Sequence, residues 1–191
     1  MLDIRPTDIA GVLLITARVF EDDRGTFSET YNRARWRDHG IAADFIQDNT
    51  VLSRRAGTVR GLHFQRPPTA QAKLVRVVHG AVWDVVVDIR AGSPTYGRWT
   101  AIELSAANRQ QVFIPTGLAH GYVSLLPDTE ITYKVDAPYA PQQEAGIAWD
   151  DPALGIPWPL PQSGPVIADR DRGLPRLGEA APCFTWTGGG A

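Results

Sequence analysis

Cysteine, lysine and long apolar runs are scarce in this chain of 191 residues. The single cysteine, Cys183, has no partner within the chain for a disulfide. No apolar run reaches the roughly 20 residues of a membrane span, and the N-terminus lacks the apolar stretch of a signal peptide. We therefore expect a cytoplasmic protein with no membrane partner.

Signatures of nucleotide-binding loops and metal sites are also missing. No G-x-x-x-x-G-K-[ST] or G-x-G-x-x-G segment occurs, so any phosphate must be held by side chains. No His-x-His pair occurs, and no carboxylate stands at a familiar ligand spacing from His63 or His120, which argues against a metal site. A formal net charge of -2 gives the chain no general attraction to nucleic acid.

The chain does contain many short segments typical of β-strands. They are rich in β-branched and aromatic residues, and Gly, Pro, Asn or Asp bounds most of them. The predicted strands are residues 12–20, 45–52, 58–65, 73–78, 81–89, 99–104, 112–114, 119–125 and 130–135. Only residues 32–39 have the pattern of a helix. The sequence therefore predicts an all-β sandwich or barrel, with a tight hairpin at Gly80.

One domain accounts for most of the chain. The length and the 43% hydrophobic content predict a single domain with a full core, over residues 1–175. Prolines become frequent from about residue 150, so this part should wrap over the barrel as an ordered loop. The tail, residues 176–191, ends in a glycine run and is expected to be frayed.

The densest group of chemically useful residues lies between positions 60 and 79. Arg60-Gly61-Leu62-His63 is followed by Lys73 at the start of a valine-rich strand. Period-2 alternation places Lys73 on one strand face with Val75 and Val77. A histidine base, an ammonium for a developing oxyanion and an arginine for an anion can then meet in one pocket, as proton abstraction beside a carbonyl requires.

Each of these residues also has an ordinary structural interpretation. His63 can be a hydrogen-bonded core histidine, Lys73 a strand-end charge that reaches solvent, and Tyr133 an aromatic core filler. His120 follows a turn and begins a strand, where its side chain can rim a cavity. The run 169–172 has the composition of a solvated charged segment. Alternation alone leaves these alternatives open.

A series of motifs then occurs in a fixed order along the chain. It comprises Phe20-x3-Arg24-Gly25-x-Phe27-x-Glu29 and residues 45–49, 59–65, 73–77, 87–90, 93–97, 114–121, 133–134 and 149–152. In combination these motifs closely resemble the dTDP-4-dehydrorhamnose 3,5-epimerase family, over roughly residues 10–175. The resemblance implies a cupin-type jelly roll with a few short helices, a homodimer that exchanges N-terminal strands, and catalysis without a cofactor.

The resemblance also implies roles for individual residues. His63 is the expected general base, Asp171 the carboxylate that orients its imidazole, Tyr133 the proton donor on the opposite face of the sugar, and Lys73 the cation beside the C4 oxygen. The expected substrate contacts, besides Lys73, are Arg24, Glu29, Gln47, Arg60, His120, Tyr139, Glu144 and Arg170. The chain departs from the family pattern at Val51, at Pro138 and at Arg170, where a lysine is common.

The resemblance implies 3,5-epimerisation of dTDP-4-dehydro-6-deoxy-D-glucose to dTDP-4-dehydro-L-rhamnose. Protons would be abstracted next to the 4-keto group and returned from the opposite face. A relative that inverts only C3 or only C5, or that uses another nucleotide, is an alternative within the same class. From other classes, a metal-dependent cupin needs ligand spacings that the chain lacks, and a non-catalytic sugar-binding cupin needs no proton donor.

Overall fold

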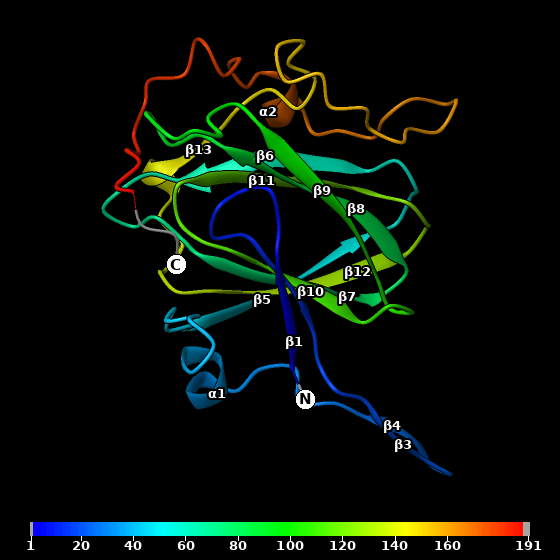
Figure 1. Ribbon diagram of the computed structural model, residues 1–191. Helices are drawn as coiled ribbons and strands as arrows, with labels where there is room; N and C mark the ends of the chain where they lie inside the picture. Colours follow the sequence, from blue (N-terminus) through cyan, green and yellow to red (C-terminus); the bar gives the residue numbers. More distant parts are fainter. Residues whose placement is uncertain (1, 189–191) are drawn as a thin grey trace.

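Two antiparallel β-sheets packed face to face make up the body of the protein (Figure 1). The computed structural model describes residues 2–188. One sheet is six-stranded, with the order β1-β2-β10-β7-β12-β5. Its strands are β1 (Asp3–Pro6), β2 (Leu13–Thr16), β10 (Gln110–Ile114), β7 (Lys73–His79), β12 (Thr129–Val135) and β5 (Gln47–Ser53).

The other sheet is five-stranded, with the order β13-β6-β11-β8-β9. Its strands are β13 (Glu144–Gly146), β6 (Val59–Gln65), β11 (Leu118–Ser124), β8 (Ala81–Asp88) and β9 (Trp99–Ser105). Gly80, at a positive φ of 79°, makes the predicted tight turn between β7 and β8. The expected all-β jelly-roll sandwich is confirmed.

Helices are few and short: α1 (Arg33–Arg37), α2 (Asp169–Arg172) and the 3-10 turn η1 (Pro141–Gln143). The Asn32 side chain caps α1 by accepting a hydrogen bond from the Arg35 amide, and the helix buries Trp36. Among residues 2–188, no helix is long and apolar enough to cross a membrane.

Alternating side chains of the two facing sheets form the core between them. Val75 and Val77 of β7 pack with Val82 and Val86 of β8, and each is at most 5% exposed. Burying one such side chain contributes roughly 1.5–3 kcal/mol. This inter-sheet layer also holds the main cavity, since Val75 belongs both to the core cluster and to the cavity wall.

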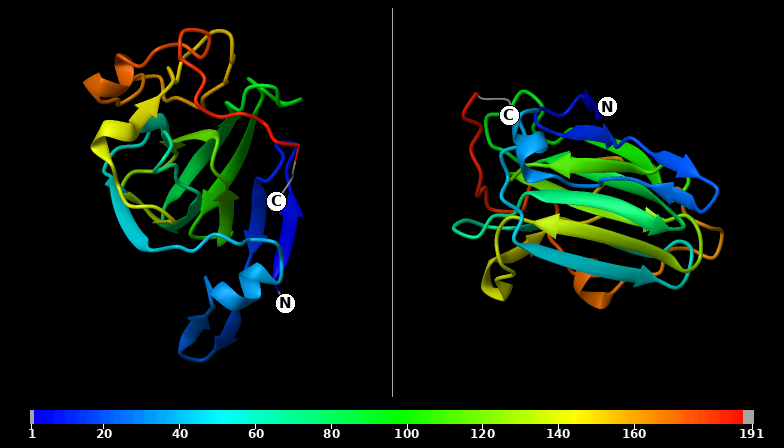
Figure 2. Two further views of the ribbon diagram at one scale, coloured as in Figure 1. Left: turned by 90° about the vertical axis from the view of Figure 1, so that its left-hand side faces the viewer. Right: turned by 90° about the horizontal axis from the view of Figure 1, so that it is seen from below.

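Separate apolar clusters cover the outer faces of the sheets. On the six-stranded sheet, Trp36 and Ile41 pack against strand residues such as Phe113. On the five-stranded sheet, Leu154 and Trp158 of the proline-rich segment pack against the outer side chains of β8. This segment therefore lies over the sandwich as ordered loop, as Figure 2 shows from two further directions.

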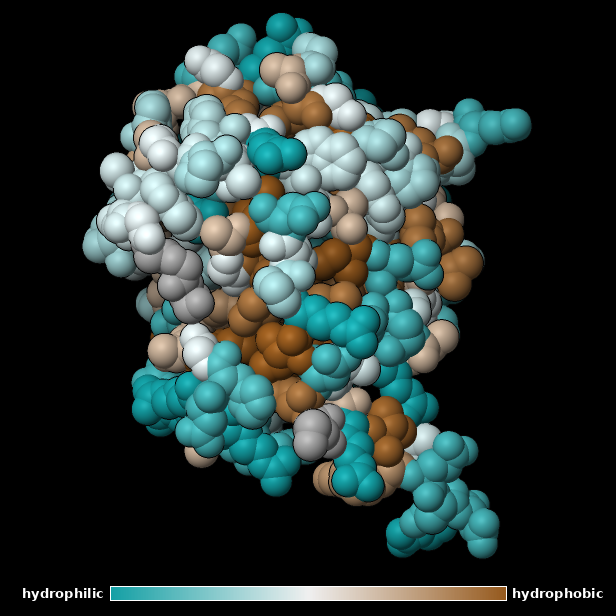
Figure 3. Space-filling model, in the orientation of Figure 1, coloured by the Kyte–Doolittle hydropathy of each residue, from teal (hydrophilic) through white to brown (hydrophobic). Residues whose placement is uncertain are grey.

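An N-terminal arm stands away from this body (Figure 1, Figure 3). We use this name for residues 18–29, which contain the hairpin of β3 (Phe20–Asp22) and β4 (Gly25–Phe27). Phe20 and Phe27 are 49% and 69% exposed, their ring centroids are 6.4 Å apart, and the Arg18 guanidinium lies 4.5 Å from the Phe20 ring. Two large apolar side chains thus lie on a surface that the single chain leaves uncovered.

The structure differs from the predicted strands in a few places. The strand predicted for residues 12–20 ends at Thr16, because its pairing with both β1 and β10 ends there. The strands β1, β3, β4 and β13 are missing from the prediction. They are three or four residues long, too short for period-2 alternation to stand out.

The tail also differs from the expectation of a frayed end. Phe184 packs edge-on against Phe64, Thr185 forms a parallel bridge with Ala91, and the Trp186 ring lies 4.4 Å from the Arg90 guanidinium. Apolar and aromatic side chains therefore hold residues 176–188 against the body. The end of the predicted tail, residues 189–191, lies outside the described residues.

Candidate active site

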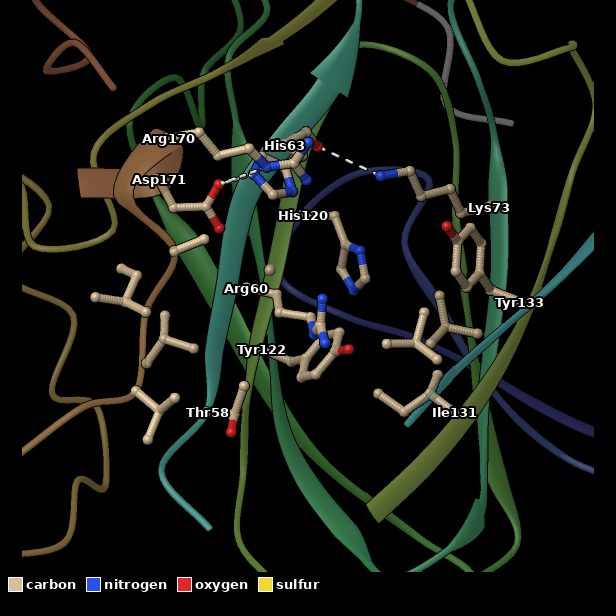
Figure 4. Close-up of a pocket in the computed structure, with 17 residues that line it drawn as sticks. Thr58, Arg60, His63, Lys73, His120, Tyr122, Ile131, Tyr133, Arg170 and Asp171 are labelled. Carbon is tan, nitrogen blue, oxygen red and sulfur yellow. Dashed lines mark hydrogen bonds and ion pairs between the residues drawn. The ribbon is translucent and has the colours of Figure 1, made fainter. Parts of the chain in front are cut away.

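A cavity of about 520 Å³ lies between the two sheets (Figure 4). Its walls come from strands of both sheets and from the segment around α2. Most residues predicted for the site line it together: Arg60, His63, Lys73, His120, Tyr133, Arg170 and Asp171. Residues far apart in the sequence thus meet in one pocket.

His63 is paired with a buried carboxylate. Its Nε2 donates a hydrogen bond to Asp171 Oδ1 at 2.8 Å, and the Gly61 amide donates to Oδ2 at 3.3 Å. Burial alone would raise the pKa of the Asp171 carboxyl, but the hydrogen bond and charge of His63 and the Gly61 amide hold that pKa below its ordinary value. Because Nε2 carries the donated proton, Nδ1 is the ring nitrogen left for chemistry.

Two glycines bring β6 and β11 into close contact beside His63. A Cβ on Gly61 would lie 2.6 Å from the Cα of Gly121, and the φ of Gly61 is 119°, so both sterics and backbone conformation require glycine. The register pairs His63 directly with His120 across these strands. The two imidazoles are therefore neighbours on one wall of the cavity.

His120 is part of a second histidine–carboxylate pair, which the sequence analysis missed. Its Nε2 donates to Asp84 Oδ2 at 2.8 Å, and both side chains are buried. Asp84 stands on β8 on the same face as Val82 and Val86, which point into the core. The sequence did contain a signal for this pair, because an acidic residue on the core-facing side of a valine-rich strand needs a buried partner.

Lys73 reaches into the cavity from the six-stranded sheet. Its Nζ lies 3.4 Å from the carbonyl oxygen of His63 (Figure 4). Burial lowers the pKa of the Lys73 ammonium to about 8, and the negative charges of Asp84 and Glu144 limit this fall. The strand-end charge in solvent is therefore the wrong interpretation of this residue.

Tyr133 faces His63 from the opposite side of the cavity (Figure 4). It belongs to β12 of the six-stranded sheet, whereas His63 belongs to β6 of the five-stranded sheet. Burial raises the pKa of the Tyr133 hydroxyl, so this group carries its proton at neutral pH. The cavity therefore has a basic nitrogen on one wall and a protonated hydroxyl on the other.

Tyr122 and Arg60 line the cavity beyond His120, and each has a buried polar atom without a partner. The Tyr122 hydroxyl and Arg60 Nε have no hydrogen-bond partner among residues 2–188. Burial raises the pKa of the Tyr122 hydroxyl to about 12, so it is a neutral donor. Unpaired buried donors favour a polar or anionic guest in this part of the cavity.

A chain of polar contacts runs along the rim of the pocket. The Tyr139 hydroxyl donates to Glu144 Oε2 at 2.6 Å, Glu144 Oε1 lies 3.3 Å from Arg170 Nη1, and Arg170 Nε lies 3.4 Å from Asp171 Oδ1. Tyr139 and Arg170 are exposed, so these rim groups remain available to a ligand.

Five predicted contact residues lie outside the cavity lining: Tyr139 and Glu144 at its rim, and Arg24, Glu29 and Gln47 farther away. Gln47 donates to Asn49 within β5 at 2.9 Å. Arg24 pairs with Asp22 at 2.6 Å in the N-terminal arm, and Glu29, at the end of that arm, pairs with Arg35 at 3.1 Å. Within one chain, the arm places Arg24 and Glu29 away from the pocket.

The described part of the chain contains no cluster of potential metal ligands. Within residues 2–188, no group of three or more His, Cys, Asp or Glu side chains is arranged to hold an ion. The carboxylates nearest to the cavity histidines, Asp171 and Asp84, are each engaged by one imidazole. The residues present thus offer acid–base groups rather than a ligand set.

Proton transfer next to a carbonyl needs a base, an electrostatic partner for the oxyanion and a proton source, and this cavity has a candidate for each. Placed in a cupin-type β-sandwich, this set defines the class as an isomerase. The family model described as dTDP-4-dehydrorhamnose 3,5-epimerase matches residues 6–179. The chain belongs to this family.

Individual relatives agree with this assignment. The dTDP-4-dehydrorhamnose 3,5-epimerase of Sinorhizobium fredii is 48% identical over 178 residues, which cover 93% of this chain and 91% of the relative. The crystal structure of the Legionella pneumophila dTDP-6-deoxy-D-glucose-3,5-epimerase, in complex with dTDP-4-keto-L-rhamnose, matches with a TM-score of 0.93 at 36% identity, covering 98% of this chain and 100% of that one. A 3′-monoepimerase of Streptomyces bikiniensis, in complex with dTDP-quinovose, matches with a TM-score of 0.84 at 35% identity, covering 91% and 87%.

Proposed function

We propose that this chain catalyses the 3,5-epimerisation of dTDP-4-dehydro-6-deoxy-D-glucose to dTDP-4-dehydro-L-rhamnose. The observation that carries the proposal is the placement of His63 and Tyr133 on opposite walls of one cavity, with Lys73 reaching in beside them (Figure 4). Inversion at carbon needs a base on one face and a proton donor on the other. The cytoplasmic location of the reaction stays a prediction.

His63 begins the reaction by taking a proton from carbon through Nδ1. The 4-keto group acidifies the hydrogens on C3 and C5, and an imidazole nitrogen with a free lone pair can accept one of them. Asp171, bound to Nε2 at 2.8 Å, holds the ring orientation and stabilises the imidazolium that forms. The electron pair of the broken C–H bond moves into the enolate and onto the C4 oxygen.

Lys73 and Tyr133 complete the inversion. The ammonium of Lys73 stabilises the charge on the C4 oxygen, an effect typically worth about 3–4 kcal/mol when one such donor is removed. Tyr133 gives its proton to the carbon from the opposite face, and the enolate returns to the ketone. His63 then loses the abstracted proton to solvent and Tyr133 regains one, so each inversion introduces one solvent hydrogen.

Arginines suit the diphosphate of a nucleotide sugar. Arg60 has a buried Nε without a partner among residues 2–188, and Arg170 stands on the rim beside Glu144 and Tyr139. Guanidinium groups bind phosphate oxygens in pairs, so these two can hold the diphosphate while the sugar lies between His63 and Tyr133. His120 lines the same cavity and presents Nδ1 to the sugar, because Nε2 is bound to Asp84.

We also propose a homodimer that exchanges N-terminal strands. The N-terminal arm exposes Phe20 and Phe27, and it carries Arg24 and Glu29 away from the pocket of its own chain. A second copy that covers this arm would bury its aromatic side chains and could receive Arg24 at the rim of its pocket. Replacement of the exposed Phe20 and Phe27 by Asp, which leaves β1 and β2 in the sheet, should then yield a monomer by light scattering; an unchanged dimer would contradict strand exchange.

Incubation with dTDP-4-dehydro-6-deoxy-D-glucose in deuterated water tests the reaction. NMR should show deuterium at both C3 and C5 together with conversion to the L-rhamno configuration. The match to a 3′-monoepimerase supports a second candidate, inversion of C3 alone, and exchange at one carbon would support it. Exchange at neither carbon would contradict both forms of the proposal.

A further inference from the structure

Asp84 is a buried carboxylate that the proposed proton transfers do not use. It is 1% exposed and does not line the cavity. Its Oδ2 accepts the hydrogen bond from His120, whereas Oδ1 has no hydrogen-bond partner among residues 2–188. Burying a carboxylate with one unpaired oxygen is costly unless a positive charge lies close enough to compensate.

Lys73 is a positive charge that enters the same layer from the opposite sheet. Lys73 belongs to β7 and Asp84 to β8, in opposite sheets, and both point into the layer between the sheets. Their strand neighbours on the same faces, Val75 and Val82, belong to one packed core cluster. In the described part of the chain, Lys73 has no ion pair within 4.0 Å, and its one hydrogen bond is the long contact to the His63 carbonyl.

The other charged and titratable groups near Lys73 cannot replace this carboxylate. They line this cavity or stand at its rim and are Arg60, His63, His120, Tyr122, Tyr133, Glu144, Arg170 and Asp171. Of these, only Glu144 and Asp171 are acidic. Glu144 is already shared with Arg170 and Tyr139 at the rim, and Asp171 is bound by His63 and by the Gly61 amide. Within residues 2–188 no arginine pairs with Asp84, so its charge remains available to the ammonium.

We propose that Asp84 serves two groups of the pocket at once: it fixes the imidazole of His120 through Nε2, and it supplies the negative charge that keeps Lys73 protonated at neutral pH. Asp84 is therefore a positioning residue, because it acts through His120 and Lys73. The use of this ammonium at a C4 oxygen rests on the proposed function, but the charge relation is a property of the free protein. Consistent with it, the charge of Asp84 is the largest influence that opposes the burial-induced fall in the Lys73 pKa.

The chain is well suited to a direct measurement, because Lys73 and Lys134 are its only lysines. Protein labelled with ¹³C at the lysine Cε should give two titrating NMR signals. Lys134 pairs with Asp48, so its signal is an internal reference. In Asp84→Asn, a side chain of the same shape without the charge, the Lys73 midpoint should fall, because an opposite charge nearby favours the ammonium.

Glu144→Gln is the matched control, because it removes the other carboxylate that acts on Lys73. Its effect on the Lys73 midpoint should be smaller than that of Asp84→Asn. An unchanged Lys73 midpoint in Asp84→Asn, or a larger shift in Glu144→Gln, would overturn the proposal. Far-UV circular dichroism and a cooperative thermal transition show whether each variant is folded.

A second variant keeps the proposal testable if Asp84→Asn does not fold. His120→Gln leaves the carboxylate in place, so the Lys73 midpoint should stay or rise; a fall would refute the role of Asp84. These titrations need no turnover. An inactive wild-type protein would therefore contradict the proposed epimerisation and leave the test of Asp84 intact.

Discussion

Replacing Tyr133 by Phe removes a single oxygen atom from the wall opposite His63. No hydrogen bond from this hydroxyl is found among residues 2–188, and the ring is half-buried beside Ile131. The Phe ring therefore fills the same space. Removing the Tyr133 hydroxyl leaves no group among residues 2–188 without a hydrogen-bond partner. Any large loss of activity then comes from the chemical step and not from the fold.

The expected loss follows from the role of a general acid. Such assistance is typically worth about 10²–10⁴-fold, which corresponds to about 3–5 kcal/mol in the activation free energy. The rate at which the Tyr133→Phe variant inverts C3 or C5 should fall by that factor. Proton abstraction by His63 should continue, because the base and Lys73 are untouched. The variant should therefore admit deuterium at C3 or C5 with the original configuration retained.

The assay is NMR of the nucleotide sugar in deuterated water, which reports exchange and configuration separately. Tyr31→Phe is a suitable control, since Tyr31 packs edge-on against Trp36 and Phe45 outside the cavity. That variant should epimerise at the wild-type rate. A wild-type rate in Tyr133→Phe as well would refute the acid assignment and make Tyr133 a core residue.

Three further outcomes are expected. His63→Asn should abolish exchange at both C3 and C5 while dTDP binding is retained, because the base acts only in the chemical step; exchange that remains at either carbon would identify another base. Lys73 stabilises the oxyanion only in its protonated form, and its pKa is lowered to about 8, so kcat should fall as pH rises through that value. The decrease of kcat in this pH range should be absent from Lys73→Ala. Activity should survive exhaustive chelation, whereas a loss that iron or manganese restores would establish a metal-dependent mechanism.

Much of the fold could be predicted because it depends on local patterns. The strands that carry His63, Lys73 and Tyr133 are each seven residues long, enough for alternation and β-branched composition to mark them. The missed strands in the arm and β13 have three residues each, and their pairing depends on distant partners. The tail packs through Phe184 and Trp186, whose contacts with residues about 100 positions away leave no local signal.

Which residues belong to the site could be predicted more easily than which of them form hydrogen-bonded pairs. Alternation placed Lys73 on one strand face with Val75 and Val77, but the residues alone left His63, Lys73 and Tyr133 with structural alternatives. The partner of His63 lies 108 positions away on a four-residue helix, and only the resemblance suggested it. The partner of His120 was missed, because alternation puts Asp84 on the inner face of β8 but does not say which side chain from another strand it meets.

The sandwich explains how one base and one acid can serve two carbons. In a D-gluco ring the hydrogens on C3 and C5 are both axial and point to the same face, one on each side of C4. A ring held between the sheets with its C4 oxygen at Lys73 would present both hydrogens to the five-stranded sheet, where His63 stands, and its other face to Tyr133 on the six-stranded sheet. In that pose, a rotation of the ring about the C4 oxygen would exchange C3 for C5 in front of the base. Two inversions thus require one set of catalytic groups, and the choice between single and double epimerisation becomes a matter of whether the cavity wall permits that rotation.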